Sequence, residues 1–209
     1  MKILALELSS RRGSIARWDD GEEQFVVEFA NDRKHSGAFF ENLERVTQAF
    51  APAELIAVGT GPGSYAGVRI AIAAAIGLQA ATGAELIGIP SICAIPTDAV
   101  SYCVIGDARR ETFYYARIEK GKCAAGPTLC DAAELRARIA ATTTPIYSTE
   151  PLPMFERAEV IPPSAAVLAL LAGQGLSEHS TAPVEPIYLR EPHITVSKQP
   201  PPAFNLPHS

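Results

Sequence analysis

Residues 3–22 have the sequence ILALELSSRRGSIARWDDGE, and residues 103–122 have the sequence CVIGDARRETFYYARIEKGK. Each stretch contains an apolar run, an acidic residue near the end of that run, an Arg-Arg pair, a second apolar run and a short charged turn. Laid side by side, the two stretches place Glu7 opposite Asp107. Apolar runs joined by short polar turns are typical of β-hairpins, and a hairpin that recurs indicates a duplicated unit. The sequence therefore predicts two copies of one lobe, the second smaller than the first.

The hydrophobic periodicity predicts the elements that surround each hairpin. For the first lobe it predicts strands at 2–8, 13–19, 23–30 and 55–61 and helices at 35–50 and 64–82. After the second hairpin it predicts a strand at 122–124, a helix at 131–140, a strand at 145–148 and a helix at 164–172. We therefore assign residues 1–98 to the first lobe, 99–183 to the second lobe, and the Pro-rich residues 184–209 to a tail at the surface.

The composition, with 47% hydrophobic and 20% charged residues, is that of a globular protein. Eighteen basic and 23 acidic side chains give a formal net charge of -5. The chain as a whole thus lacks the basic surface that a protein needs to bind nucleic acid unaided. A role on RNA would require a partner.

The cysteines and the N-terminal residues indicate the cellular compartment in which we expect the protein. The four cysteines form no CxxC pair and show none of the Cys/His spacings of a zinc site. No charged and apolar leader precedes the first strand, so we expect a reducing, cytoplasmic location. The uncharged run 70–84 is shorter than the roughly 20 apolar residues that span a bilayer, so we expect no membrane association.

The stretch GTGPGSYAGVR, residues 59–69, lies between a buried strand and a helix. Backbone amides of such a glycine-rich turn, followed by a helix N-terminus, can bind an anion through Gly61, Gly63 and Ser64. The stretch lacks the lysine of a P-loop and does not fit the dinucleotide fingerprint. A second interpretation, which we favour, is a sharp structural turn in which Ser64 caps the helix.

The helix after this turn has a face of small side chains. Its members are Gly63, Gly67, Ala71, Ala74, Ala75 and Leu78. Small side chains allow the helix backbone to approach a neighbour closely. The neighbour is either the protein's own sheet or another subunit, and the sequence leaves both open.

Six stretches resemble the TsaB (YeaZ) family, in matching order over nearly the whole chain. They are LALELSS, KHSGAFFENL, GTGPGSYAGVRIAIAAAIGLQAATG, IGIPSICA, GDARRETFYYA and EPIYLRE. The resemblance implies an α/β protein of the actin/Hsp70/sugar-kinase-like (ASKHA) fold, with two ribonuclease-H-like lobes and mixed sheets. It also implies a part in making threonylcarbamoyladenosine (t6A) on tRNA, beside the anticodon.

In that family TsaB is a non-catalytic paralogue of the transferase subunit TsaD, and TsaE, an ATPase, joins the assembly. The resemblance therefore implies a scaffold that binds TsaD through its first two helices, forms a homodimer when alone, and meets tRNA only through the complex. The expected interface comprises His35, Phe39, Phe40, Leu43 and Val46 of the first helix together with the small face of the second. Transferases of the TsaD type place two histidines four residues apart on the first helix; here His35 is followed by Phe39, so we expect no metal site and no catalytic residue.

An alternative from another class is an actin-like small-molecule kinase or ATPase. It would use Glu7, Asp107 and Arg69 with the glycine-rich turn to contact a nucleotide. We expect no resident cofactor, although the resemblance leaves room for ATP or ADP at a boundary between subunits.

Overall fold

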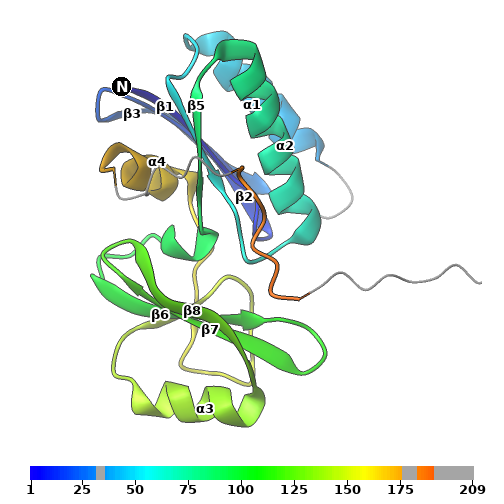
Figure 1. The fold of residues 1–209 in the computed structure, drawn as a ribbon, viewed down its shortest axis with the longest axis vertical. Helices are drawn as coiled ribbons and strands as arrows, with labels where there is room; N and C mark the ends of the chain where they lie inside the picture. The colour runs from blue at the N-terminus through cyan, green and yellow to red at the C-terminus, as the bar shows by residue number, and fades with distance from the viewer. Residues whose placement is uncertain (32–35, 176–182, 191–209) are drawn as a thin grey trace, which may run out of the picture.

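The computed structural model describes residues 1–31, 36–175 and 183–190, and these form two lobes (Figure 1). The first lobe contains β1 (Lys2–Glu7), β2 (Arg12–Asp19), β3 (Glu22–Ala30), α1 (Gly37–Ala49), β4 (Leu55–Gly59), α2 (Tyr65–Thr82) and β5 (Glu85–Ile89). A short 3-10 helix, η1 (Ser91–Cys93), leads to the second lobe. That lobe contains β6 (Ser101–Asp107), β7 (Thr112–Glu119), β8 (Lys122–Asp131), α3 (Ala132–Ala141), β9 (Ile146–Ser148) and β10 (Glu159–Val160), and α4 (Ala165–Gly173) follows.

The first sheet has the strand order β3-β2-β1-β4-β5, in which β1, β2 and β3 pair antiparallel while β4 and β5 run parallel to β1. Successive side chains of a strand point to opposite faces of the sheet. Accordingly Leu4 and Leu6 of β1 pack in the core under α1 and α2, whereas Ile3 and Ala5 pack in the core under α4. The sheet is therefore a buried middle layer between helices (Figure 1).

The second sheet repeats this arrangement with the order β10-β9-β6-β7-β8. Its β6–β7 hairpin corresponds to the β1–β2 hairpin, and β9 runs parallel to β6 as β4 does to β1. The predicted duplication and the mixed-sheet ASKHA fold are confirmed. The third strand, however, extends to Asp131 instead of ending at 124, and β10 has only two residues, so the second copy is reduced at one edge.

Helix α4 departs from the expected lobe boundaries. The sequence assigned 99–183 to the second lobe, yet α4 contacts β1, β2 and β4 of the first sheet. The core under α4 also includes Tyr102 and Val104 of β6, so one core spans both lobes. An apolar helix at this position in the chain packs wherever an uncovered sheet face lies, and that face belongs to the first lobe.

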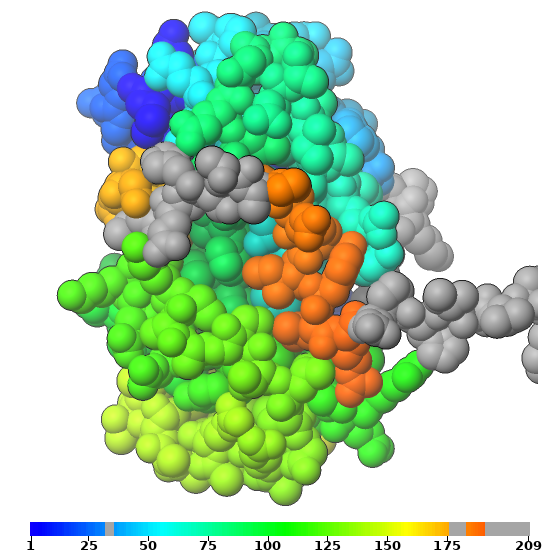
Figure 2. Space-filling model, in the orientation of Figure 1, coloured from blue at the N-terminus to red at the C-terminus, as the bar shows by residue number. Residues whose placement is uncertain are grey.

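Residues 183–190, which we call the strap, lie along the boundary of the two lobes (orange in Figure 2). The Ile187 amide donates a hydrogen bond to the Thr60 carbonyl over 2.8 Å, and Val184 and Leu189 pack on the cores of the molecule. Residues 184–190 are partly or fully exposed, as expected for a segment at the surface, and these contacts attach them to the folded body. Residues 191–209 lie outside the described residues.

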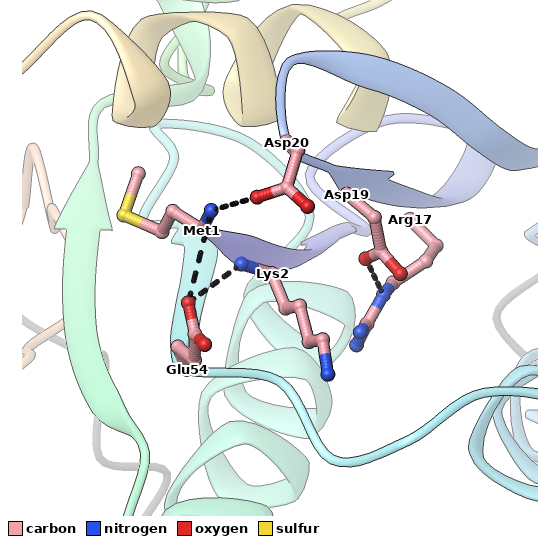
Figure 3. A network of polar contacts seen from close by, with 6 residues as sticks. All are labelled: Met1, Lys2, Arg17, Asp19, Asp20 and Glu54. Atoms are coloured by element: carbon pink, nitrogen blue, oxygen red, sulfur yellow. Dashed lines mark hydrogen bonds and ion pairs between the residues drawn. The ribbon is translucent and has the colours of Figure 1, made fainter.

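A polar network surrounds the start of β1, at the end of the strand that lies away from the strap (Figure 3). The terminal amine of Met1 pairs with Asp20 at 2.5 Å, and the Lys2 amide donates to Glu54 at 2.9 Å. Arg17 is buried, pairs with Asp19 and lies over the Phe50 ring. These contacts hold the start of β1 against the turns beside it.

Within the described part of the chain, α2 alone is long and apolar enough to cross a membrane by length and composition. We expected the run 70–84 to be too short, but the helix reaches 18 residues because it begins at Tyr65. Its inner side packs on the first sheet, as a core helix does.

Candidate functional site

A cavity of about 490 Å³ lies between the two lobes. Its walls come from the end of β1, the N-terminus of α2, the β6–β7 turn and the strap. Three of the predicted anion contacts line it: Gly63, Ser64 and Asp107. The fold thus brings the glycine-rich turn of one lobe opposite the acidic hairpin of the other.

The glycine-rich turn uses its backbone amides within the protein. The Ser64 amide donates to the Ser9 carbonyl over 2.6 Å, and the Gly61 amide donates to Ser91 Oγ over 3.0 Å. Ser64 Oγ accepts from the Gly67 amide over 3.2 Å, as the helix cap expected from the sequence. A turn whose amides bond its own neighbours is the structural interpretation that we favoured.

Steric contacts explain two of the glycines. A Cβ on Gly63 would lie 2.2 Å from the Ser9 carbonyl oxygen, and a Cβ on Gly67 would lie 2.1 Å from that of Leu8. Both distances are far inside van der Waals contact. The glycines therefore let α2 begin directly against the end of β1, which fixes the helix N-terminus at the cavity.

Gly61 and Arg69, two further predicted anion contacts, do not line the cavity. Gly61 is buried with φ +88° and its amide is taken by Ser91, while Arg69 is exposed and hydrogen-bonds the Tyr65 hydroxyl. The cavity therefore brings together Gly63, Ser64 and Asp107 but not Gly61 and Arg69.

Glu7 is also not in the cavity: it is 0% exposed. Its Oε1 accepts from the Ser9 amide at 2.6 Å, and its Oε2 has no hydrogen-bond partner among the described residues. Gly59 is required beside it, since a Cβ there would lie 1.9 Å from Oε2. Burial raises the pKa of Glu7, because a charged carboxylate loses its hydration in the core, and the Ser9 hydrogen bond opposes this only in part. Of the two roles open to Glu7, a nucleotide contact or a buried carboxyl that bonds its own turn, the geometry of the folded chain favours the second.

Asp107 holds the β6–β7 turn. Its carboxylate accepts from the Arg109 amide at 2.6 Å and pairs with the Arg109 guanidinium at 3.1 Å. Arg109, Arg110 and Glu111 all have positive φ angles, a conformation that costs free energy at non-glycine residues. The Asp107 bonds stabilise this turn at the cavity wall.

Most of the predicted interface side chains are core residues. Those that are buried within the first lobe are Phe39, Leu43, Val46, Gly67, Ala71 and Ala75. They face the first sheet, because the apolar stripe of a helix packs on the nearest apolar layer. Direct partner contact by these six side chains is therefore wrong. Phe40 is 50% exposed, Ala74 and Leu78 are partly exposed, and His35 lies outside the described residues.

An aromatic cluster beside the cavity went unnoticed in the sequence. Tyr65 and Tyr188 stack with ring centres 5.2 Å apart, and Arg69 Cζ lies 5.0 Å from the centre of the Tyr65 ring. Tyr65 and Tyr188 are 123 positions apart in the sequence, so no spacing pattern indicates that they meet. The signal in the sequence is the late EPIYLRE stretch, which contains Tyr188.

No metal site emerges from the described ranges 1–31, 36–175 and 183–190. They hold no group of three or more His, Cys, Asp or Glu side chains that could bind a metal ion.

Two mixed-sheet lobes facing each other across a cavity define a protein of the actin/Hsp70/sugar-kinase-like class. YeaZ from Pseudomonas aeruginosa has this fold, with a TM-score of 0.68 at 21% identity over 90% of this chain and 99% of that one. A P. aeruginosa protein described as similar to peptidase YeaZ gives 0.73 with the same identity and coverage.

Sequence comparison gives the family. The model for TsaD, tRNA N6-adenosine threonylcarbamoyltransferase, matches residues 32–149, more than half of the chain. The chain belongs to this family, and within it to the TsaB (YeaZ) type.

Two relatives illustrate the extent of the match. The tRNA threonylcarbamoyladenosine biosynthesis protein TsaB of Escherichia coli is 30% identical over 132 residues, covering 57% of this chain and 56% of TsaB. An uncharacterized protein of Mycobacterium tuberculosis is 30% identical over 145 residues, covering 68% of this chain and 66% of that protein. The match thus spans less than two thirds of the length of each relative, 56% of TsaB and 66% of the M. tuberculosis protein.

Proposed function

We propose that this protein is a non-catalytic scaffold in the formation of t6A on tRNA, binding a TsaD-like transferase subunit. A TsaE-like ATPase joins the assembly, the protein forms a homodimer when the transferase subunit is absent, and the assembly works in the cytoplasm. Any ATP or ADP would lie at a boundary between subunits. The observation that carries the proposal is the outer face of α2.

That outer face is apolar and has no partner within the described residues. It presents Ala73, Ile76, Gly77 and Ala80, and no charged residue follows Arg69 in the helix. Ile76 is 48% exposed. A helix of this length on the surface of a monomer normally turns charged or polar side chains to water. Apolar, closely approachable surface of this kind marks an interaction site.

Gly77 supplies an independent argument. A Cβ at this position would meet no heavy atom within 4 Å, so the protein's own fold does not require glycine there. Glycine in the middle of a helix costs about 0.5–1 kcal/mol relative to alanine. A helix from another subunit that packs against this point would explain the glycine, since glycine permits close backbone approach.

Helix α1 carries a further exposed apolar side chain, Phe40, whose ring centre lies 5.1 Å from that of the buried Phe39. The half-exposed ring is an aromatic anchor of the type that contributes most to protein interfaces. The proposed interface therefore consists of Phe40, Ala73, Ile76, Gly77 and Ala80, in place of the inward-facing residues.

The test is co-purification of tagged protein with a TsaD-like subunit of the same genome. We expect Ile76→Glu to abolish co-purification, because it places a charge in an apolar interface. The matched control is Leu170→Glu, which introduces the same charge at an exposed apolar position, 41% exposed, on α4. The control should co-purify as the wild type does.

Circular dichroism melts must first show that both variants are folded. Wild-type protein that fails to retain the transferase subunit, or folded Ile76→Glu that retains it fully, would contradict the proposal.

A further inference from the structure

The stacked tyrosines at the cavity form an exposed platform. Tyr65 is 52% exposed and Tyr188 is 43% exposed, and their rings lie within 29° of parallel. Arg69 adds a guanidinium group beside the Tyr65 ring. Aromatic pairs of this size are ordinarily buried, because each ring offers a large apolar area.

The strap places this platform between the lobes. The Ile187 amide bonds the first lobe at Thr60, and Arg190 hydrogen-bonds Thr112 of the second lobe. Tyr188 lies between these two attachments, so its ring is held in place. A platform whose rings are fixed before binding loses little conformational entropy on binding.

Charge at the rim differs from charge over the whole chain. The cavity lining includes Arg11, Arg109 and Arg190 against two carboxylates, Asp107 and Glu150, whereas the chain has a net charge of -5. Asp107 is already paired with Arg109. Arg11 is exposed, and its side chain makes no ion pair with the described residues. The rim therefore combines available positive charge with exposed ring faces.

We propose that this rim binds a single-stranded segment of RNA, with a nucleobase stacked on the Tyr65–Tyr188 platform and neighbouring phosphates beside Arg11 and Arg190. Base stacking on aromatic rings together with arginine contacts to phosphates is how proteins hold unpaired RNA. Duplex RNA offers no free base face, and an acidic peptide offers nothing to stack. The inference rests on the proposed function, in which the assembled complex meets tRNA.

The rim carries too few arginines to bind RNA strongly alone, in keeping with the acidic chain. It therefore acts as one contact of the complex, which supplies the rest of the affinity. The RNA-binding rim and the proposed interface on the outer face of α2 do not overlap. Tyr65 is the first residue of α2, and Gly77 lies about three turns later.

The experiment measures binding of a fluorescein-labelled anticodon stem-loop RNA to the complex of this protein with its TsaD-like subunit, by fluorescence anisotropy. Tyr188→Ala should weaken binding about tenfold, because stacking of one base contributes roughly that much. Tyr188→Phe keeps the ring and should bind within about twofold of wild type. Arg11→Gln should reduce the slope of log Kd against log salt by about 0.7, the value for one lost phosphate contact on a single strand.

Arg136→Gln is the matched control for Arg11→Gln, since Arg136 is exposed on α3 in the second lobe, away from the cavity lining. It should leave both affinity and salt slope unchanged. Each variant is first shown to co-elute with the transferase subunit, which separates loss of RNA contact from loss of assembly.

Equal affinity of Tyr188→Ala and wild type would overturn the inference while leaving the scaffold proposal intact. Weakened binding of free ATP by Tyr188→Ala, with RNA affinity unchanged, would overturn it in favour of a mononucleotide site. If wild type fails to assemble, the scaffold proposal is contradicted. In that case the same titration is carried out with this protein alone at low salt. Equal RNA affinity of Tyr188→Ala and wild type would then overturn the inference about the rim.

Discussion

Helix α2 carries small residues on two opposite faces, and the two faces meet different surroundings. On the inner face, Ala71 and Ala75 are 0% exposed and Gly67 lies against the end of β1. On the outer face, Ala73 and Gly77 are exposed, and a Cβ at Gly77 would meet no heavy atom within 4 Å. Residues two apart on a helix point in nearly opposite directions, so a shift of two positions along the sequence leads from the core to the surface. A small-residue composition identifies a helix that packs closely, but it does not say which face packs against what.

The largest effect is expected from placing arginine on the inner face. Ala71→Arg buries an unpaired charge against the first sheet and should lower the free energy of unfolding by about 3–5 kcal/mol. Ala73→Arg is two residues away on the outer face and should change it by no more than about 0.5 kcal/mol. Urea unfolding followed by circular dichroism measures both. Similar midpoints for the two variants would refute the assignment of faces.

A smaller loss is expected at Gly67. Gly67→Ala puts a methyl group where the Leu8 carbonyl oxygen would be 2.1 Å away, so the helix start must shift. Such overpacking costs about 1–3 kcal/mol. The urea midpoint of Gly67→Ala should therefore fall below that of wild type, and an unchanged midpoint would show that the close approach is not needed.

Glu7, which fixes Ser9 beneath the inner end of α2, gives a pH-dependent effect. Burial raises the pKa of Glu7 in the folded state, so the folded protein holds this proton more tightly than the unfolded chain does. Stability contributed by the neutral carboxyl is present at low pH and is lost as pH rises through the folded-state pKa. Glu7→Gln removes this loss, and its melting temperature should exceed that of wild type increasingly as the pH rises above the unfolded-state pKa of about 4.3, by about 2–4 °C per kcal/mol.

Exposed Glu23 on β3 provides the control for this pH series. Glu23→Gln should follow the wild-type melting curve at every pH. A constant difference between Glu7→Gln and wild type across the pH range would argue against titration of Glu7.

The smallest change in stability is expected on the outer face. Gly77→Ala should raise the free energy of unfolding by about 0.5–1 kcal/mol, because alanine restricts the unfolded chain and favours the helix. The same methyl group should weaken retention of the transferase subunit, since it occupies the space of the partner helix. Gain of stability without loss of retention would remove Gly77 from the interface.

Much of the fold was predictable because its signals are local. The duplicated hairpin, the helix of 64–82 with its Ser64 cap and the capped helix from Asp131 each follow from apolar period and capping residues that lie close together in the chain. The sheet against which α4 packs was not predictable in this way. An apolar stretch of nine residues has no polar face to reveal its orientation, and the strands that it contacts lie more than a hundred positions earlier in the chain.

The candidate site divides in the same manner. Ser64, Gly63 and Asp107 were found because each stands at the end of a predicted strand or the start of a helix, where a cavity wall forms. Glu7 stands at a strand end as well, but its side chain turns into the core beside Gly59. Tyr188 reaches the site through the strap, which is held by hydrogen bonds to Thr60 and Thr112 in different lobes rather than by any periodic pattern in its own sequence.

The return of α4 to the first sheet governs the order in which the molecule is completed during translation. While the ribosome is still making the second lobe, Ile3, Ala5, Leu55 and Ala57 remain open to water on one face of the first sheet. Only when residues 165–173 have emerged does the nascent chain hold the helix that covers them. The core of the first lobe is therefore completed only after the second lobe has been synthesised. Premature termination before α4 would leave an exposed apolar sheet face for chaperones and proteases to recognise.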